Sequence, residues 1–348
     1  MAEVLRYVNT ASTAGGDGTT NGTAGATRAY ATMSEWEANE GTNLITDGDT
    51  HRVLCSGGAD STAVTLNGFT CDATHTCTIE GEWDASTGRF DSSKYNIAVT
   101  TGNQIAVGQN WSIFDKLQYD GGGTANHGAF LDTSKDNNVF KNSVFYDLAR
   151  TGTWQRSTNV GTVHENNLFY DLGWGCIGTD GTNTSRGTLY NCTGYNYNTS
   201  NHAGGSFTHQ NTNGQWKVVN CIGIASTSST RADFEQTYTL ATGSDYNASS
   251  DTSAPGANSI HSITASTEFV SVTGGSEDFH LDSGSTLLAD GVGPSSDAAV
   301  PTTDIDGDTR SGTTTDIGFD LYVAVGGGAT PKGPFFHPFY GPFRGPIS

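Results

Sequence analysis

The chain has 348 residues, with 16 Lys and Arg against 36 Asp and Glu, and its net charge of −20 is spread along the sequence. This balance excludes nucleic acids and anionic membranes as partners, because binding to phosphate needs clusters of Lys and Arg. Turn formers and β-branched residues dominate, with 46 Gly, so an all-β chain is expected. No apolar run approaches the roughly 20 residues of a membrane span.

Residues 1–52 are predicted to form a first strand, a Gly/Asp/Thr loop and a short helix. Ser34 to Glu37 reads as a capping box, and Met33 and Trp36 give the helix an apolar face. We expect this helix to cover one end of the domain that follows, because an open sheet edge invites aggregation. Short strands and Gly-rich turns then follow to about residue 125.

One phrase returns four times between residues 137 and 224. Its asparagines, Asn142, Asn166, Asn191 and Asn220, are 24, 25 and 29 residues apart. The same alignment places Tyr119-Asp120 before Tyr146-Asp147 and Tyr170-Asp171, as one more copy of the repeat. A period in the twenties, with no room for a helix in each unit, predicts a β-solenoid.

The repeat resembles the rungs of right-handed parallel β-helices of the pectate-lyase-like kind, in which an Asn often stacks at a turn. Residues 4–55 are similar to the opening of many such proteins. The resemblance implies an all-β, single-stranded right-handed parallel β-helix over residues 53–300, with an N-terminal capping helix and an extended C-terminal tail. At about 4.8 Å per rung, we expect about nine coils and a length on the order of 45 Å.

Six cysteines show no framework spacing. Cys192 and Cys221 each follow a repeat Asn, so we expect them to stack as buried thiols. Cys71, His75 and Cys77 could form part of a zinc site, but zinc usually takes four ligands with tightly spaced pairs. Structural thiols are the favoured interpretation, with a disulfide as the next alternative, and no metal site is predicted.

Residues 301–325 are predicted to be a terminal rung. Their Asp304-x-Asp306-x-Asp308 run and the later Asp316-Ile-Gly resemble the closing segment of β-helix repeat proteins, many of them anchored at cell surfaces. Calcium is an alternative for the Asp run, but the glycine and the final Glu of an EF-hand loop are missing. We therefore expect a turn paired with Arg310, and no cofactor.

Residues 326–348 are rich in Gly, Pro and aromatic residues. Proline favours extended backbone, and such segments dock well into grooves. We expect this tail to anchor the chain to another subunit or partner, with a disordered tail as the alternative. The anchoring residues are Phe335, Phe336, Phe339, Tyr340 and Phe343.

Candidate chemistry lies in one column of the repeat. Asp147 and Asp171, flanked by Asp120 and Asn196, would stack about 5 Å apart, which is the separation of the carboxylates in retaining glycosidases. His164 and Glu165 would lie nearby, and the sugar-stacking residues would be Trp154, Trp174 and Tyr197. The alternative, which we favour, is that Asp and Asn after a strand are ordinary turn residues.

Three functions fit these observations. The first is a non-catalytic virion protein, such as a phage tail-spike, fibre or capsid decoration, that binds host glycans, docks through its tail and forms an oligomer such as a homotrimer. The second is an extracellular polysaccharide lyase or glycoside hydrolase, and the third is a cell-surface adhesin. The first residues lack the regions of a signal peptide, so we expect a virion or extracellular location reached from a mature end or by cell lysis.

Overall fold

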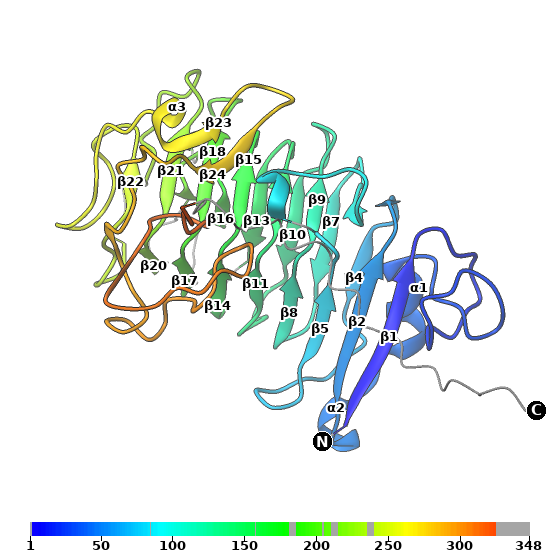
Figure 1. Cartoon of the computed structure of the whole chain (residues 1–348). Coiled ribbons are helices and arrows are strands. Elements are labelled where there is room, and N and C mark those ends of the chain that lie inside the picture. Colours follow the sequence, from blue (N-terminus) through cyan, green and yellow to red (C-terminus); the bar gives the residue numbers. More distant parts are fainter. Residues whose placement is uncertain are drawn as a thin grey trace, which may run out of the picture.

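A computed structural model describes residues 2–83, 85–156, 158–180, 186–203, 205–209, 215–234 and 240–324. Three parallel sheets wind around one axis in about seven turns (Figure 1). From β2 to β19 each turn contributes one strand to each sheet, and strands inside a sheet pair with those of the previous and the next turn. The fold is therefore a parallel β-helix, as predicted, although it has fewer turns than expected. None of its described helices is long and apolar enough to cross a membrane.

Within each turn the chain passes through sheet 1, then sheet 3 and finally sheet 2. Sheet 1 contains β1 (Glu3–Asn9), β2 (Thr50–Ser56), β5 (Cys77–Glu80), β8 (Ser112–Asp115), β11 (Val139–Lys141), β14 (Val160–Glu165), β17 (Arg186–Tyr190) and β20 (Gln215–Val219). Sheet 3 contains β3 (Ala59–Asp60), β6 (Asn96–Ile97), β9 (Gln118–Asp120), β12 (Val144–Tyr146), β15 (Leu168–Tyr170), β18 (Thr193–Tyr197), β21 (Ile222–Ala225) and β22 (Ala248–Ser249). Sheet 2, which closes each turn, contains β4 (Val64–Leu66), β7 (Asn103–Val107), β10 (His127–Leu131), β13 (Thr151–Gln155), β16 (Ile177–Thr179) and β19 (Thr208–His209).

The interior of the solenoid is filled by stacked aromatic rings. Tyr119, Phe145 and Phe169 form one ladder, with centroid distances of 4.3 and 4.8 Å between successive rings. Phe114 and Phe140 begin a second ladder, and His164 continues it at 5.1 Å from Phe140. The expectation that His164 lies beside Asp147 and Asp171 is wrong, because its ring is completely buried inside the solenoid.

The repeated asparagines stack at the turn between sheets 1 and 3. Asn142, Asn166, Asn191 and Asn220 all have positive φ, between 49° and 55°. Asn tolerates this left-handed conformation better than most residues. Asn166 Nδ2 donates to Asn142 Oδ1 at 3.1 Å, and Asn220 Nδ2 donates to Asn191 Oδ1 at 3.3 Å. The predicted asparagine stack is confirmed.

The cysteines have the predicted character. All six are free, and Cys192 and Cys221 are buried on neighbouring turns. The backbone N–H of Cys192 lies 3.5 Å from Cys221 Sγ, which places the two residues directly above one another. Burial raises the pKa of the Cys192 thiol well above its usual range, so these thiols serve packing rather than reactivity.

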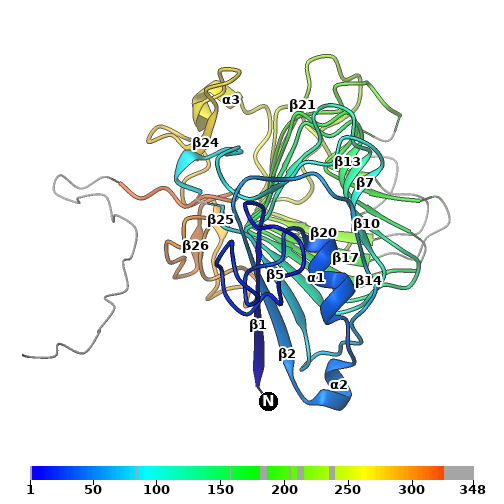
Figure 2. The same cartoon turned by 90° about the vertical axis from the view of Figure 1, so that its right-hand side faces the viewer.

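The helix α1 (Met33–Glu40) lies across the N-terminal end of the solenoid, followed by the short α2 (Leu44–Asp47) (Figure 2). Trp36 of α1 is buried and stacks on Phe69 at 5.2 Å. The predicted capping role is confirmed, but the predicted capping box at Ser34 is wrong. Thr32 is the N-cap, since its Oγ1 accepts the N–H of Glu35 at 3.1 Å, and Glu35 in turn accepts the N–H of Ala31.

The stacked sheets end at β22, and the chain then folds back along the solenoid. We call residues 262–322 the return segment; they appear in yellow and orange in Figure 1. It contains α3 (Ala265–Glu268) and two antiparallel pairs, β23 (Phe269–Ser271) with β24 (Asp278–Leu281) and β25 (Gly291–Val292) with β26 (Thr314–Thr315). Outside this segment, a short 3-10 turn, η1, spans Ala85–Thr87 between β5 and β6. The parallel sheets therefore end before residue 300, and the described part of the predicted terminal rung at 301–325 adds no strand to them.

The return segment has a hydrophobic core of its own against the outer face of sheet 3. This second core is separate from the solenoid interior and consists of side chains from sheet 3 and from the return segment. Sheet 3 contributes Val144, Leu168 and Ile222, and the return segment contributes Phe279 and Ile317. Burial of these apolar side chains explains why the chain turns back, because the outer face of sheet 3 would otherwise be exposed to water.

Candidate functional site

The predicted carboxylate pair lies at the end of sheet 3. Asp147 and Asp171 follow β12 and β15, and Asn196 lies within β18. All three have positive φ, of 50°, 55° and 48°. Asn196 Nδ2 donates to Asp171 Oδ1 at 2.6 Å. The stack is real, and its left-handed backbone alone accounts for Asp and Asn at these positions.

Asp120 does not belong to this stack. Tyr119 aligns with Phe145 and Asp120 with Tyr146, so the earlier turn is shifted by one residue. Tyr119 consequently points into the core, where it is completely buried. The predicted alignment of Asp120 with Asp147 is wrong, although Asp120 is close enough to influence it electrostatically.

The two carboxylates repel one another and are only partly solvated. Burial raises the pKa of Asp147, and the charges of Asp120 and Asp171 raise it further. Burial also raises the pKa of Asp171, although the hydrogen bond from Asn196 opposes this. A raised pKa suits a general acid. However, neither carboxylate forms an ion pair with a Lys, Arg or His of the described chain.

Aromatic side chains cover the outer face of sheet 3 next to the pair. Phe90 stacks on Tyr146 at 5.1 Å, and Phe279 of the return segment contacts Tyr170 and Tyr195, each at 5.1 Å. A hollow of about 270 Å³ opens beside them, lined by residues such as Tyr195, Asn196, Ile224, Ser250 and Ile263. Its lining includes neither Asp147 nor Asp171. The pair therefore does not face this hollow.

A second candidate surface lies on the outer face of sheet 2. We call it the aromatic face and define it by Phe130, Arg150, Trp154, Trp174 and His202. Phe130 and Trp154 are neighbours across β10 and β13, and Trp154 is in turn paired with Gly178 of β16. A Cβ atom at Gly178 would lie only 2.4 Å from the Trp154 ring, so the indole rests flat against the backbone of the next turn.

The aromatic face combines rings with positive charge. The Trp154 and Trp174 rings are 6.0 Å apart in an edge-to-face arrangement. His202 stacks on Trp174 at 3.8 Å, and the Arg150 guanidinium lies 4.8 Å from the same ring. Both tryptophans are half-buried, with part of each ring at the surface. Flat rings next to hydrogen-bond donors can bind the apolar face and the hydroxyls of a sugar.

The structure brings Trp154 and Trp174 together, but not Tyr197. Tyr197 is fully buried, and its hydroxyl donates to the Asp233 carbonyl at 2.7 Å. Its prediction as a sugar-stacking residue is therefore wrong. The positive φ of Asn196 and a register shift between Tyr195 and Tyr197 turn its ring inward. The sequence analysis missed Phe130, which is the one residue of β10 that is not fully buried.

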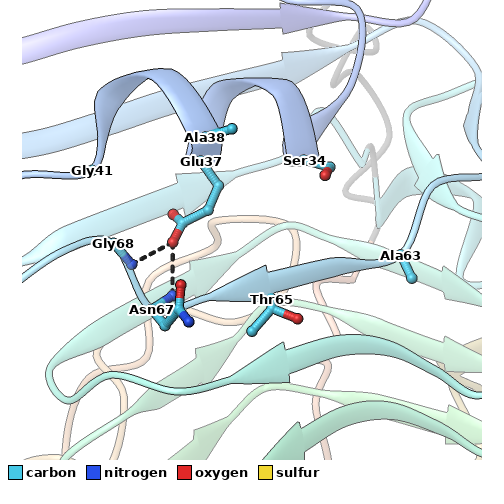
Figure 3. Close-up of a pocket in the computed structure, with 8 residues that line it drawn as sticks. All are labelled: Ser34, Glu37, Ala38, Gly41, Ala63, Thr65, Asn67 and Gly68. Atoms are coloured by element: carbon cyan, nitrogen blue, oxygen red, sulfur yellow. Dashed lines mark hydrogen bonds between the residues drawn. The ribbon is translucent and has the colours of Figure 1, made fainter.

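A further cavity of about 480 Å³ lies between α1 and β4 (Figure 3). Its lining is mostly small and polar, consisting of Ser34, Glu37, Ala38, Gly41, Ala63, Thr65, Asn67 and Gly68. Glu37 Oε1 accepts the N–H groups of Asn67 and Gly68 at 2.7 and 2.5 Å. Burial raises the pKa of Glu37, and these two bonds oppose the rise. The carboxylate thus fastens α1 to the first turns of the solenoid.

Three sheets of stacked parallel strands, an asparagine turn and stacked core aromatics define the class of the protein as a parallel β-helix. No family model and no curated protein matches the chain. Among solved structures, pectate lyase Pel9A is similar at a TM-score of 0.41 and 12% identity. The alignment covers 91% of this chain and 96% of that one. The predicted anchoring residues Phe335, Phe336, Phe339, Tyr340 and Phe343 lie outside the described residues.

Proposed function

We propose that the chain is a non-catalytic β-helix that binds surface glycans through its aromatic face, as a structural or appendage protein of a virion. The observation that carries the glycan-binding part is the Trp154 ring, which lies flat on Gly178 beside Trp174 and Arg150. The net negative charge fits a protein that must stay soluble, and the aromatic residues near the C-terminus fit one that attaches to a particle through that end. A virion or extracellular location and assembly into an oligomer belong to the same proposal.

The non-catalytic part of the proposal is supported by Asp147 and Asp171. Their positive φ and the hydrogen bond between Asp171 and Asn196 explain these residue types without any reaction. An acid and a nucleophile also need a substrate site between them. The hollow next to Asn196 does not include either carboxylate in its lining.

Trp154→Ala should weaken glycan binding about 30-fold, because a central tryptophan at a binding surface is typically worth about 2 kcal/mol. The measurement is binding of the full chain to an array of purified bacterial surface polysaccharides. Trp111→Ala is the matched control, since Trp111 lies in a turn outside the aromatic face. Equal binding by Trp154→Ala and wild type, or no binding by wild type, would contradict the proposal.

The second candidate function is a polysaccharide lyase or glycoside hydrolase, and the raised pKa values of Asp147 and Asp171 favour it. Under our proposal, Asp147→Asn and Asp171→Asn fold normally and bind glycans as the wild type does. A raised folded-state pKa means that the ionised carboxyl destabilises the fold above the unfolded pKa. Both variants should therefore melt at or above the wild-type temperature at pH 7, with the difference shrinking towards pH 4.

Thermal scans at pH 7 and pH 4 measure the unfolding temperatures of the wild type and both variants. Incubation of the wild type with polysaccharides tests whether the chain cleaves them. The Asn variants are the right choice because Asn also tolerates positive φ, whereas Ala would add strain. If the wild type cleaves a polysaccharide and both variants do not, the chain is an enzyme. A cell-surface adhesin remains the third reading, and it would bind glycans without travelling with particles.

The virion part of the proposal is tested by where the chain is found. Gradient-purified particles and the soluble medium of the source culture are compared by quantitative peptide analysis. We expect a fixed copy number per particle, which also separates a decoration protein from a tail appendage. Recovery from the soluble fraction alone would remove the virion role and leave glycan binding standing.

A further inference from the structure

Three side chains with metal-binding atoms meet on the return segment. His280 lies in β24, Asp306 in a turn between β25 and β26, and Asp320 near the end of the described residues. One ligand atom from each lies within 4.8 Å of the others, which is the one such grouping of three or more within the described part of the chain. We call these three residues the return-segment cluster.

The imidazole of His280 is oriented by a fourth residue. Its Nδ1 lies 2.5 Å from Asp278 Oδ1, and its Nε2 lies 3.0 Å from Asp306 Oδ2. In metal sites, a ligating His typically donates its other ring N–H to a carboxylate, which fixes the ring and the tautomer. Asp278 would play that part here, leaving Nε2 directed at the centre of the cluster.

Asp320 is the buried carboxylate of the cluster. It is 4% exposed, and its Oδ2 accepts the Leu281 N–H at 2.8 Å. No described residue donates a hydrogen bond to its Oδ1. A buried carboxylate with one oxygen still free is a ready ligand for a cation.

The Asp304-x-Asp306-x-Asp308 run does not act as a calcium loop. Asp304 Oδ1 accepts the N–H groups of Asp306 and Asp308 at 3.0 and 2.7 Å, and its Oδ2 accepts the N–H of Leu321 at 2.9 Å. Asp304 is thus used as a turn former, as predicted, and of the three only Asp306 belongs to the cluster. The ligand set is one imidazole nitrogen and two carboxylates, whereas calcium takes oxygen ligands.

We propose that His280, Asp306 and Asp320 bind one divalent transition-metal cation, best matched by zinc, which fastens the return segment. Zinc accepts His nitrogen and Asp oxygen at about 2.0–2.2 Å in tetrahedral geometry, which places ligand atoms roughly 3.3 Å apart. The cluster must therefore contract modestly, and Asp306 can move because its side chain is 27% exposed. A water molecule would complete the coordination.

The bound cation would add a link between parts of the return segment that are distant in sequence. It would link β24 to the turn at Asp306 and to Asp320. A ligand that binds only the folded state raises the unfolding temperature as its concentration exceeds Kd. At 100 times Kd, we expect zinc to raise the unfolding temperature of the full chain by roughly 4 °C.

The test uses the full chain, stripped with a chelator and then titrated with Zn²⁺, Co²⁺ or Ca²⁺ at pH 8. We expect one Zn²⁺ per chain by calorimetry, visible absorption bands with Co²⁺, and no effect of Ca²⁺. Asp306→Asn and His280→Gln should each lose at least tenfold in zinc affinity. His261→Ala is the matched control, because His261 is exposed and lies outside the cluster.

Asp306→Asn should fold even if His280→Gln does not, because Asp306 is the most exposed of the three residues. Failure of Zn²⁺ to bind at one per chain would mean that protonated His280 is the sole cation in the cluster, and would overturn the proposal. Zinc binding that Asp306→Asn and His280→Gln leave unchanged would overturn it as well, placing the ion at another group such as Cys71 and Cys77.

Discussion

Arg310→Met is expected to release the return segment and to destabilise the protein by about 3–5 kcal/mol. Arg310 is 2% exposed, so its hydrogen bonds are shielded from water. Its Nη1 donates to Asn166 Oδ1 at 2.7 Å and to the Thr303 carbonyl at 2.8 Å. Its Nη2 donates to the carbonyls of Gly318 and Phe319 at 3.2 and 2.9 Å. Methionine fills most of the space but removes all four hydrogen bonds. The carbonyls of Thr303, Gly318 and Phe319 each keep one other donor.

Urea unfolding and limited proteolysis measure the effect of Arg310→Met, with cleavage expected first within residues 262–322. Arg231→Met is the matched control, because Arg231 is exposed to solvent. Arg310→Lys should fall between wild type and Arg310→Met, since an ammonium group cannot reproduce the four-bond arrangement of the guanidinium. A stability change below about 0.5 kcal/mol, the range of neutral surface substitutions, would show that Arg310 does not fasten the segment.

Phe145→Ala should destabilise the solenoid by about 3–5 kcal/mol, at the upper end of the range for core truncations. Phe145 is the middle ring of its ladder, between Tyr119 and Phe169. Its ring edge also fits against Gly128 of sheet 2, where a Cβ atom would approach it to 2.8 Å. Because a glycine has no side chain that could move into the space, the cavity left by Phe145→Ala should stay open.

Equilibrium unfolding of Phe145→Ala is compared with that of Phe130→Ala. Phe130 is the matched control, since it is also a strand phenylalanine but lies half-buried on the outer face of sheet 2. We expect Phe130→Ala to lose no more than about 1.5 kcal/mol, because the removed ring leaves solvent rather than a cavity. Similar losses for the two variants would mean that the ladder relaxes around the missing ring.

The solenoid could be predicted from the sequence because each coil contains a turn whose left-handed backbone favours Asn. A left-handed turn recurs once per coil, and Asn142, Asn166, Asn191 and Asn220 occupy it with the same residue type. Alignment by residue type fails where the turn changes. Around Tyr119 the coil is shifted by one residue, and in a strand such a shift sends a side chain to the opposite face.

The return segment and the aromatic face could not be predicted in the same way. Strands such as β24 have the same local pattern whether they pair in parallel or antiparallel, and only tertiary packing decides between the two. The apolar outer positions Val144 and Leu168 are a signal that sheet 3 has a second covering layer. Trp174 and His202 meet from two loops, and the spacing of the repeat does not report loop conformation.

The position of Arg310 against Asn166 also has a consequence for biosynthesis. The two residues are separated by 144 positions, so the acceptor leaves the ribosome well before its donor. At typical elongation rates of about 5–20 residues per second, the delay is roughly 7–30 seconds. During that interval the outer face of sheet 3 presents Val144, Leu168 and Ile222 to the cytosol. Nascent chains that stall or end early should therefore depend on chaperones or aggregate, whereas complete chains bury this surface themselves.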